Sequence, residues 1–187
     1  EKRKVILVTD GDYFAKQAVE AAARNIGGCV ITESAGNPTP LSPESAIRLI
    51  MEAEGDPVIV MVDDSGHIGM GPGEELMLKI INHPDIDVLG VVAVATNTEK
   101  GERIEVTQSV TRDGKVIDRG VNKYGTPVAS RVVTGDTLSI LKQMSVPVII
   151  GLGDPGKMSY LDDAAKGAPL TTKALKEILE AQKERPQ

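Results

Sequence analysis

Short apolar runs alternate with amphipathic stretches along most of the chain. Between the runs, apolar residues recur at spacings of three and four, which indicates helices that bury one face. This alternation predicts parallel β-α-β units, and runs that are apolar throughout indicate a sheet covered on both faces. We expect an α/β fold, a three-layer Rossmann-like sandwich with a mainly parallel sheet, formed by residues 1–187 as one domain. The expected strands are residues 5–8, 29–31, 58–62, 88–95 and 147–150.

Several expected helices carry recognisable start signals. Ser42 is a suitable N-cap, and Pro43 and Pro72 suit first helical positions, where a missing N–H costs nothing. The helix after the first strand is expected to bury a face that includes Phe14. A last helix is expected at about residues 172–185.

The pattern changes after the fourth strand. Residues of about 103–121 alternate between polar and apolar on both sides of Asp113-Gly114, and Asp-Gly between two such runs is a strong hairpin signal. We expect an inserted antiparallel β-hairpin that extends the sheet or covers its edge. A short helix is expected at about residues 136–144, before the last strand.

Composition narrows the classes of function. The chain has a net charge of −6, no Trp, one Phe and three Tyr, so it lacks the basic surface and aromatic platforms of nucleic-acid binding. Cys29 is the one cysteine, which excludes an intrachain disulfide. No segment resembles a signal peptide or approaches the roughly 20 apolar residues of a membrane span. We expect a soluble protein whose membrane role, if it has one, is peripheral.

Polar residues follow the expected strands, and the carboxyl ends of parallel strands share one edge of a sheet. A ligand site is therefore expected there, although turns and helix caps also favour Asp, Asn and Gly without any ligand. The candidate ligand-binding residues are Asp10, Asp12, Asn37, Asp63, Asp64, Ser65, Gly66, Thr96, Asn97, Asp154 and Lys157.

This edge is rich in carboxylates, which suit a hard cation such as Mg²⁺ or Ca²⁺. The candidate metal ligands are Asp10, Asp12 and Asp63. Adjacent residues of an extended strand point to opposite faces, so at most one of Asp63 and Asp64 should face the shared site. The sequence assigns no catalytic residue and requires no cofactor.

Three enzyme motifs are nearly matched, and each lacks a needed residue. A P-loop spacing runs from Gly151 to Lys157, but Met158 stands where that motif has a hydroxyl for Mg²⁺. Asp10-x-Asp12 resembles the haloacid-dehalogenase-like phosphatases, whereas Asp154 lacks the partner acid of that family. The acids after the first and third expected strands also resemble a Toprim site, with altered residues and spacing. A Mg²⁺-dependent phosphatase-like hydrolase at the acidic edge therefore remains the alternative function.

Four stretches carry a resemblance over nearly the whole chain: VILVTDGDYFAKQAVEAAA, ESAGNPTPLS, PVIVMVDDSGHIGMGPGE and VIIGLGDPGKMSYLDDAAKGAPLTTKAL. They are similar to stage V sporulation protein AE, in its soluble AEa form, of spore-forming Bacillus-type bacteria. The resemblance implies a soluble component of the spore system that transports dipicolinic acid during sporulation and germination. Together with the three incomplete enzyme motifs, it favours a non-enzymatic accessory role over an enzyme. It also implies peripheral placement at the spore inner membrane, with other stage V sporulation AA–AF proteins as partners. Calcium dipicolinate is the candidate ligand, and homo-oligomer formation is left open.

Overall fold

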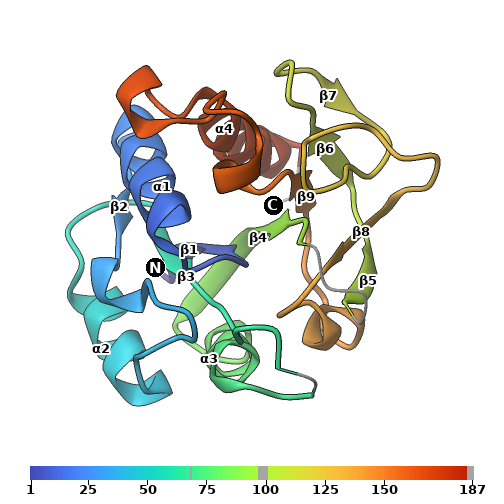
Figure 1. Ribbon diagram of the computed structural model, residues 1–187. Coiled ribbons are helices and arrows are strands. Elements are labelled where there is room, and N and C mark those ends of the chain that lie inside the picture. The colour runs from blue at the N-terminus through green and yellow to red at the C-terminus, as the bar shows by residue number, and fades with distance from the viewer. Residues whose placement is uncertain (68, 97–100, 185–187) are drawn as a thin grey trace.

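The computed structural model describes residues 1–67, 69–96 and 101–184. A seven-stranded sheet has the order β2-β3-β1-β4-β9-β6-β7, and β5 and β8 form a separate two-stranded sheet (Figure 1). In the large sheet every pairing is parallel except that of β6 with β7. The expected fold class, an α/β sandwich with a mainly parallel sheet, is confirmed.

The strands that position the site lie in the middle of the large sheet. They are β1 (Arg3–Val8), β3 (Val58–Met61), β4 (Ile86–Val94) and β9 (Ile149–Leu152), with β2 (Cys29–Val30) at one edge. The apolar residues of β1 and β3 are almost completely buried, as expected for a sheet covered on both faces. Strand β9 is shifted toward the C-terminus from the expected 147–150, so Gly151 pairs within the strand and cannot begin a phosphate-binding loop.

Helices cover both faces of the sheet (Figure 1). Helices α1 (Tyr13–Asn25) and α4 (Pro169–Lys183) contact each other on one face, and α2 (Pro43–Glu52) and α3 (Pro72–Ile81) contact each other on the other. Because successive strand residues point to opposite faces, each face has its own buried cluster. Ile6 packs with the α1 and α4 side, and Leu7 packs with the α2 and α3 side.

The predicted helix starts at Ser42, Pro43 and Pro72 are confirmed. The Ser42 hydroxyl accepts the Ser45 N–H at 3.2 Å, and both prolines occupy the first positions of their helices. Helix α4 begins at Pro169, before the expected residue 172, and its expected end at residue 185 lies outside the described residues.

The inserted hairpin is narrower than the expected 103–121. Strands β6 (Gln108–Val110) and β7 (Val116–Ile117) form a hairpin around Asp113-Gly114, and β6 pairs with β9, so the hairpin extends the sheet. Strand β5 (Glu102–Glu105) pairs instead with β8 (Val132–Gly135), because that pairing buries Ile104 against Val133.

The short helix expected at about 136–144 is reduced to the 3₁₀ helix η2 (Ser139–Lys142). Thr137 has a φ of 59°, which interrupts the right-handed backbone inside the expected helix, while Leu138 and Leu141 are buried as a helix face would be. Three further 3₁₀ turns are η1 (Thr32–Ser34), η3 (Pro155–Lys157) and η4 (Ala164–Lys166).

The four aromatic side chains of the chain are all on the surface. Tyr13 is 68% exposed, Phe14 53%, Tyr124 46% and Tyr160 68%. The expectation that Phe14 is buried is therefore wrong. Phe14 lies in the first turn of α1 and meets the Tyr13 ring edge to face, with a centroid separation of 6.1 Å. The core is built from aliphatic side chains and methionines.

Candidate functional site

A hollow of about 310 Å³ lies where the loops after β1, β3, β4 and β9 meet. The chain leaves β1 toward β2 on one side, whereas it leaves β3 and crosses to β4 on the other side of β1. Such a change of direction opens a crevice at the carboxyl ends of the strands, which is where open α/β sheets bind ligands.

Most of the candidate residues from the sequence meet in this hollow. Nine of them line it: Asp10, Asp12, Asn37, Asp63, Ser65, Gly66, Thr96, Asp154 and Lys157. Thr9 and Asp136 also line it and were not expected. Asp64 is not among the lining residues, and Asn97 lies outside the described residues.

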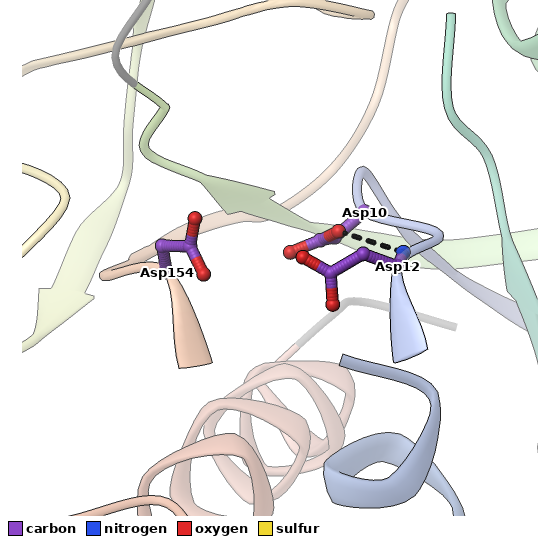
Figure 2. Close-up of side chains that lie close together, drawn as sticks. All are labelled: Asp10, Asp12 and Asp154. Atoms are coloured by element: carbon purple, nitrogen blue, oxygen red, sulfur yellow. Dashed lines mark hydrogen bonds between the residues drawn. The ribbon is translucent and has the colours of Figure 1, made fainter. Parts of the chain in front are cut away.

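Three carboxylates converge on the β1 and β9 side of the hollow. Asp10, Asp12 and Asp154 each present an oxygen atom, and these oxygen atoms all lie within 4.8 Å of one another (Figure 2). Asp10 and Asp154 are buried, and Asp12 is half-buried. The metal ligands expected from the sequence included Asp63 in place of Asp154; the structure places Asp154 in this group.

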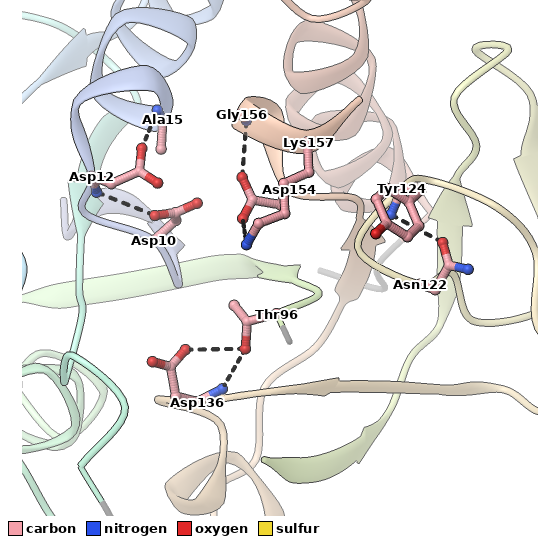
Figure 3. Close-up of polar contacts among 10 residues, drawn as sticks. All are labelled: Asp10, Asp12, Ala15, Thr96, Asn122, Tyr124, Asp136, Asp154, Gly156 and Lys157. Atoms are coloured by element: carbon pink, nitrogen blue, oxygen red, sulfur yellow. Dashed lines mark hydrogen bonds and ion pairs between the residues drawn. The ribbon is translucent and has the colours of Figure 1, made fainter. Parts of the chain in front are cut away.

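Backbone hydrogen bonds fix the orientation of these carboxylates. Asp12 is the N-cap of α1, and its Oδ1 accepts the Ala15 N–H at 2.9 Å. The Asp12 N–H in turn donates to Oδ1 of Asp10 at 3.2 Å. Asp154 caps η3, since its Oδ1 accepts the Gly156 N–H at 2.9 Å (Figure 3). Turn and cap geometry therefore holds all three acids in place.

Lys157 is the one basic residue among the described residues that line the hollow, against five aspartates. Its Nζ lies 3.0 Å from Oδ2 of Asp154 (Figure 3). That hydrogen bond raises the pKa of Lys157, and the negative charges of Asp154, Asp10 and Asp12 raise it further, so the ammonium stays charged. One ammonium leaves most of the acidic charge uncompensated.

Burial makes ionisation of two aspartates unfavourable. The pKa of Asp10 is raised well above its usual range, first by desolvation and then by the charges of Asp12 and Asp154. Desolvation raises the pKa of Asp63 to about 6, although hydrogen bonds from the Ser65 and Gly11 N–H groups oppose the rise. A cation in the hollow would favour the charged forms of both groups.

Asp63 and Asp64 lie just after the end of β3, and their side chains bind different partners, as expected for adjacent residues. Oδ2 of Asp63 accepts the Gly11 N–H at 3.0 Å beside the hollow. Oδ1 of Asp64 instead accepts the N–H groups of Gly73 at 2.7 Å and Glu74 at 3.3 Å at the N-terminus of α3. Asp64 therefore serves as a helix cap.

Asp136 reaches the hollow from the end of β8. Its Oδ2 accepts the Gly66 N–H at 2.9 Å, and its own N–H donates to the Thr96 hydroxyl at 3.2 Å (Figure 3). The sequence carries a signal for it, because Asp136 directly follows the strand-like run of residues 132–135, much as the other site acids follow apolar runs. That signal could not place Asp136, because the partner strand of β8 was unknown.

Fold and site together define an α/β protein with an acidic hollow at the carboxyl edge of a parallel sheet. The chain belongs to the family described as stage V sporulation protein AE1, whose sequence model matches residues 4–182. Membership places the chain among sporulation proteins and confirms the resemblance seen in the sequence. Neither curated proteins nor solved structures gave a match. In the described residues, no helix combines the length and apolar character needed to cross a bilayer.

Proposed function

We propose that this protein is a non-enzymatic accessory component of the spore dipicolinic acid transport system, and that its acidic hollow binds a divalent cation, alone or as calcium dipicolinate. The observation that carries the proposal is the convergence of Asp10, Asp12 and Asp154. Family membership supports the sporulation setting.

The donor set suits Ca²⁺. This ion takes six to eight oxygen ligands at roughly 2.3–2.6 Å with flexible geometry, so two of its ligands can be up to about 5 Å apart. The 4.8 Å limit on the three carboxylate oxygens falls in that range. Asn37, Thr96 and Asp136 also line the hollow and carry further side-chain oxygen atoms, whereas the Thr9 hydroxyl is hydrogen-bonded to the β4 backbone.

In this proposal the protein acts beside membrane-embedded partners. It lies peripherally at the spore inner membrane with other stage V sporulation AA–AF proteins, holding the cation or its chelate during loading and release. One copy or several could present the hollow, and its open side leaves it accessible to both ligand and partner.

Calorimetry on the full chain tests the binding step. Ca²⁺ is titrated with and without dipicolinate into the wild type, Asp154→Asn and Asp113→Asn. Asp113 is an exposed aspartate at the tip of the β6–β7 hairpin, so it is a matched control for charge. We expect the wild type and the control to bind alike and Asp154→Asn to bind at least about tenfold more weakly, because a carboxylate ligand is lost. No heat at millimolar ligand with the wild type would overturn the proposal.

The alternative is a Mg²⁺-dependent phosphatase-like hydrolase. It is favoured by one observation, that Asp10 and Asp12 after β1 meet Asp154 from a later strand, in the arrangement such enzymes use for metal and substrate. Met158, at the position of the missing partner acid, is fully buried. Turnover of a phosphoester panel with Mg²⁺ or Mn²⁺ that disappears in Asp10→Asn would establish this alternative, and inactivity across the panel would remove it.

A further inference from the structure

A second hollow, of about 490 Å³, lies between the β5–β8 ribbon and the loop of residues 121–128. Arg103 and Lys123 line it, and Thr96 lines both this hollow and the acidic one. We propose that this second hollow, called here the basic pocket, binds the carboxylate of a small organic anion.

The pairing of β5 with β8 decides which side chains face the basic pocket. Arg103 is opposite Thr134 in the antiparallel register, and both line the pocket. Their neighbours Ile104 and Val133 form the next pair and are buried on the other side of the ribbon. Because side chains alternate along a strand, the burial of that apolar pair fixes Arg103 and Thr134 on the pocket side.

The opposite wall is a tightly bonded loop. The Asn122 N–H donates to the Thr126 carbonyl at 2.9 Å, and the Asn122 side chain accepts the Tyr124 N–H at 3.0 Å (Figure 3). Nζ of Lys123 lies 4.9 Å from the centroid of the Tyr124 ring. The Lys123 carbonyl accepts the Asp154 N–H at 2.9 Å, so the basic pocket and the acidic hollow are joined through the backbone.

Charge distinguishes the two hollows. Among the described residues that line the basic pocket are two cationic side chains and no carboxylate. Neither Arg103 nor Lys123 has an ion-pair partner within the described parts of the chain. A guanidinium and an ammonium that face the same space attract an anion, and guanidinium geometry matches a carboxylate.

The lining also indicates what the anion carries. Val121, Val128 and Val132 contribute apolar surface, and Tyr124 adds an aromatic ring. Pockets with apolar walls and a few polar groups suit organic ligands whose body contacts the walls while a polar group is fixed by hydrogen bonds. This lining therefore favours an organic carboxylate over inorganic phosphate.

The two hollows meet at Thr96, so a single ligand could occupy both. A metal-bound carboxylate could place its cation beside the aspartates and its anionic end beside Arg103. This joint occupancy rests on the proposed function, whereas the carboxylate site in the basic pocket does not.

Calorimetry with metal-free protein tests the basic pocket. The probes are dipicolinate and inorganic phosphate, each titrated without divalent cation into the wild type, the double variant Arg103→Gln/Lys123→Gln, and Lys115→Gln. Lys115 is an exposed cation on the β6–β7 hairpin and controls for general charge attraction. We expect dipicolinate to bind the wild type at least about tenfold more tightly than phosphate. The double variant should lose at least about tenfold in affinity, and the control should change less than about twofold.

Four results would overturn the inference: no dipicolinate binding by the wild type at millimolar concentration, unchanged affinity in the double variant, equal weakening by Lys115→Gln, or phosphate binding as tightly as dipicolinate. Adding Ca²⁺ separates it from the proposed function. If dipicolinate binds through Arg103 and Lys123 but Ca²⁺ never binds, the proposed function fails and the basic pocket stands. If Ca²⁺ binds and the double variant binds dipicolinate like the wild type, the basic pocket fails alone.

Discussion

The backbone N–H of Gly11 donates a 3.0 Å hydrogen bond to the carboxylate of Asp63 and thereby joins the loops after two neighbouring strands. The approach is so close that a Cβ on Gly11 would lie 2.1 Å from the Gly36 carbonyl oxygen and 2.9 Å from the Asp63 Cβ. The contact between these two loops therefore depends on a glycine at this position for space rather than for backbone conformation.

Gly11→Ala should destabilise the protein strongly. Because the clash is with a backbone carbonyl, the loop must move, and we expect the free energy of unfolding to fall by about 2–4 kcal/mol in urea denaturation. Gly114→Ala is the control, since Gly114 has a φ of 77° and a Cβ added to it would lie 3.9 Å from Leu170 Cδ2, an ordinary contact. It should cost only about 1 kcal/mol, from backbone strain. Equal losses in the two variants would show that space at Gly11 is not limiting.

Titration of Asp63 should make the free energy of unfolding depend on pH. Its pKa is raised to about 6 in the folded state, above the unfolded value of about 3.9. The folded state then holds a proton that the unfolded state has released. This contribution to stability is complete below pH ~4 and is lost as the pH rises through about 6, with a size of about 2–3 kcal/mol. Asp10, with its raised pKa, acts in the same direction.

Urea denaturation between pH 4.5 and 7.5, without divalent cations, measures this effect. The wild type should lose stability as the pH rises, and Asp63→Asn should show a shallower decline because it removes one titrating group. If the two proteins have the same pH dependence, Asp63 does not titrate in this window.

Lys157→Gln should strengthen cation binding. The ammonium competes for Asp154, so its removal frees a carboxylate and makes the hollow more negative. We expect Ca²⁺ affinity to rise severalfold in calorimetry, with a loss of at most about 0.5 kcal/mol in stability, since the ammonium is partly solvent-exposed. Lys166→Gln, which changes a lysine outside the hollow, is the control. A fall in affinity would mean that Lys157 contacts an anionic part of the ligand.

Asp162→Ala should weaken the fold without altering the acidic hollow. The buried Asp162 carboxylate accepts the N–H groups of Leu170 at 2.7 Å and Thr171 at 3.0 Å, and the Thr171 hydroxyl at 2.5 Å. It therefore caps α4. Its loss should lower the free energy of unfolding by about 2 kcal/mol in urea denaturation, while Ca²⁺ affinity at neutral pH stays unchanged. Asp163→Ala, an exchange of the neighbouring aspartate, should cost less, because the hydrogen bond that its side chain accepts from the Ala165 N–H is exposed.

Much of the fold could be predicted because each strand and helix is indicated by its own local sequence pattern. An apolar run such as residues 58–61 is a buried strand wherever it lies in the sheet, and Ser42 caps a helix whatever that helix packs against. The pairing of strands could not be predicted in this way. Alternation in residues 102–105 predicts a strand but cannot reveal that its partner is residues 132–135.

The candidate site could be predicted as far as it depends on local sequence patterns. Its remaining residues depend on tertiary contacts, which the sequence does not show. Parallel strands bring their carboxyl ends together, so Asp10, Asp12 and Asp154 could be placed at one edge from the sequence. Asp136 enters the hollow from the two-stranded β5–β8 sheet. The Asp64 carboxylate accepts the Gly73 N–H at the N-terminus of α3 instead of facing the hollow. Both placements depend on tertiary packing. Phe14 was misplaced because helical spacing puts it next to the buried face of α1 but does not show that burial begins only at Ala15.

The surface position of every aromatic ring has a consequence for spectroscopy. With no tryptophan and with Tyr13, Tyr124 and Tyr160 all at least 46% exposed, the core holds no chromophore that absorbs in the near ultraviolet. Unfolding will therefore change tyrosine emission only slightly. Tyr124 lines the basic pocket, so a ligand that enters there alters the emission of a ring it touches. The intrinsic fluorescence of this protein is therefore expected to report on occupancy of the basic pocket rather than on folding.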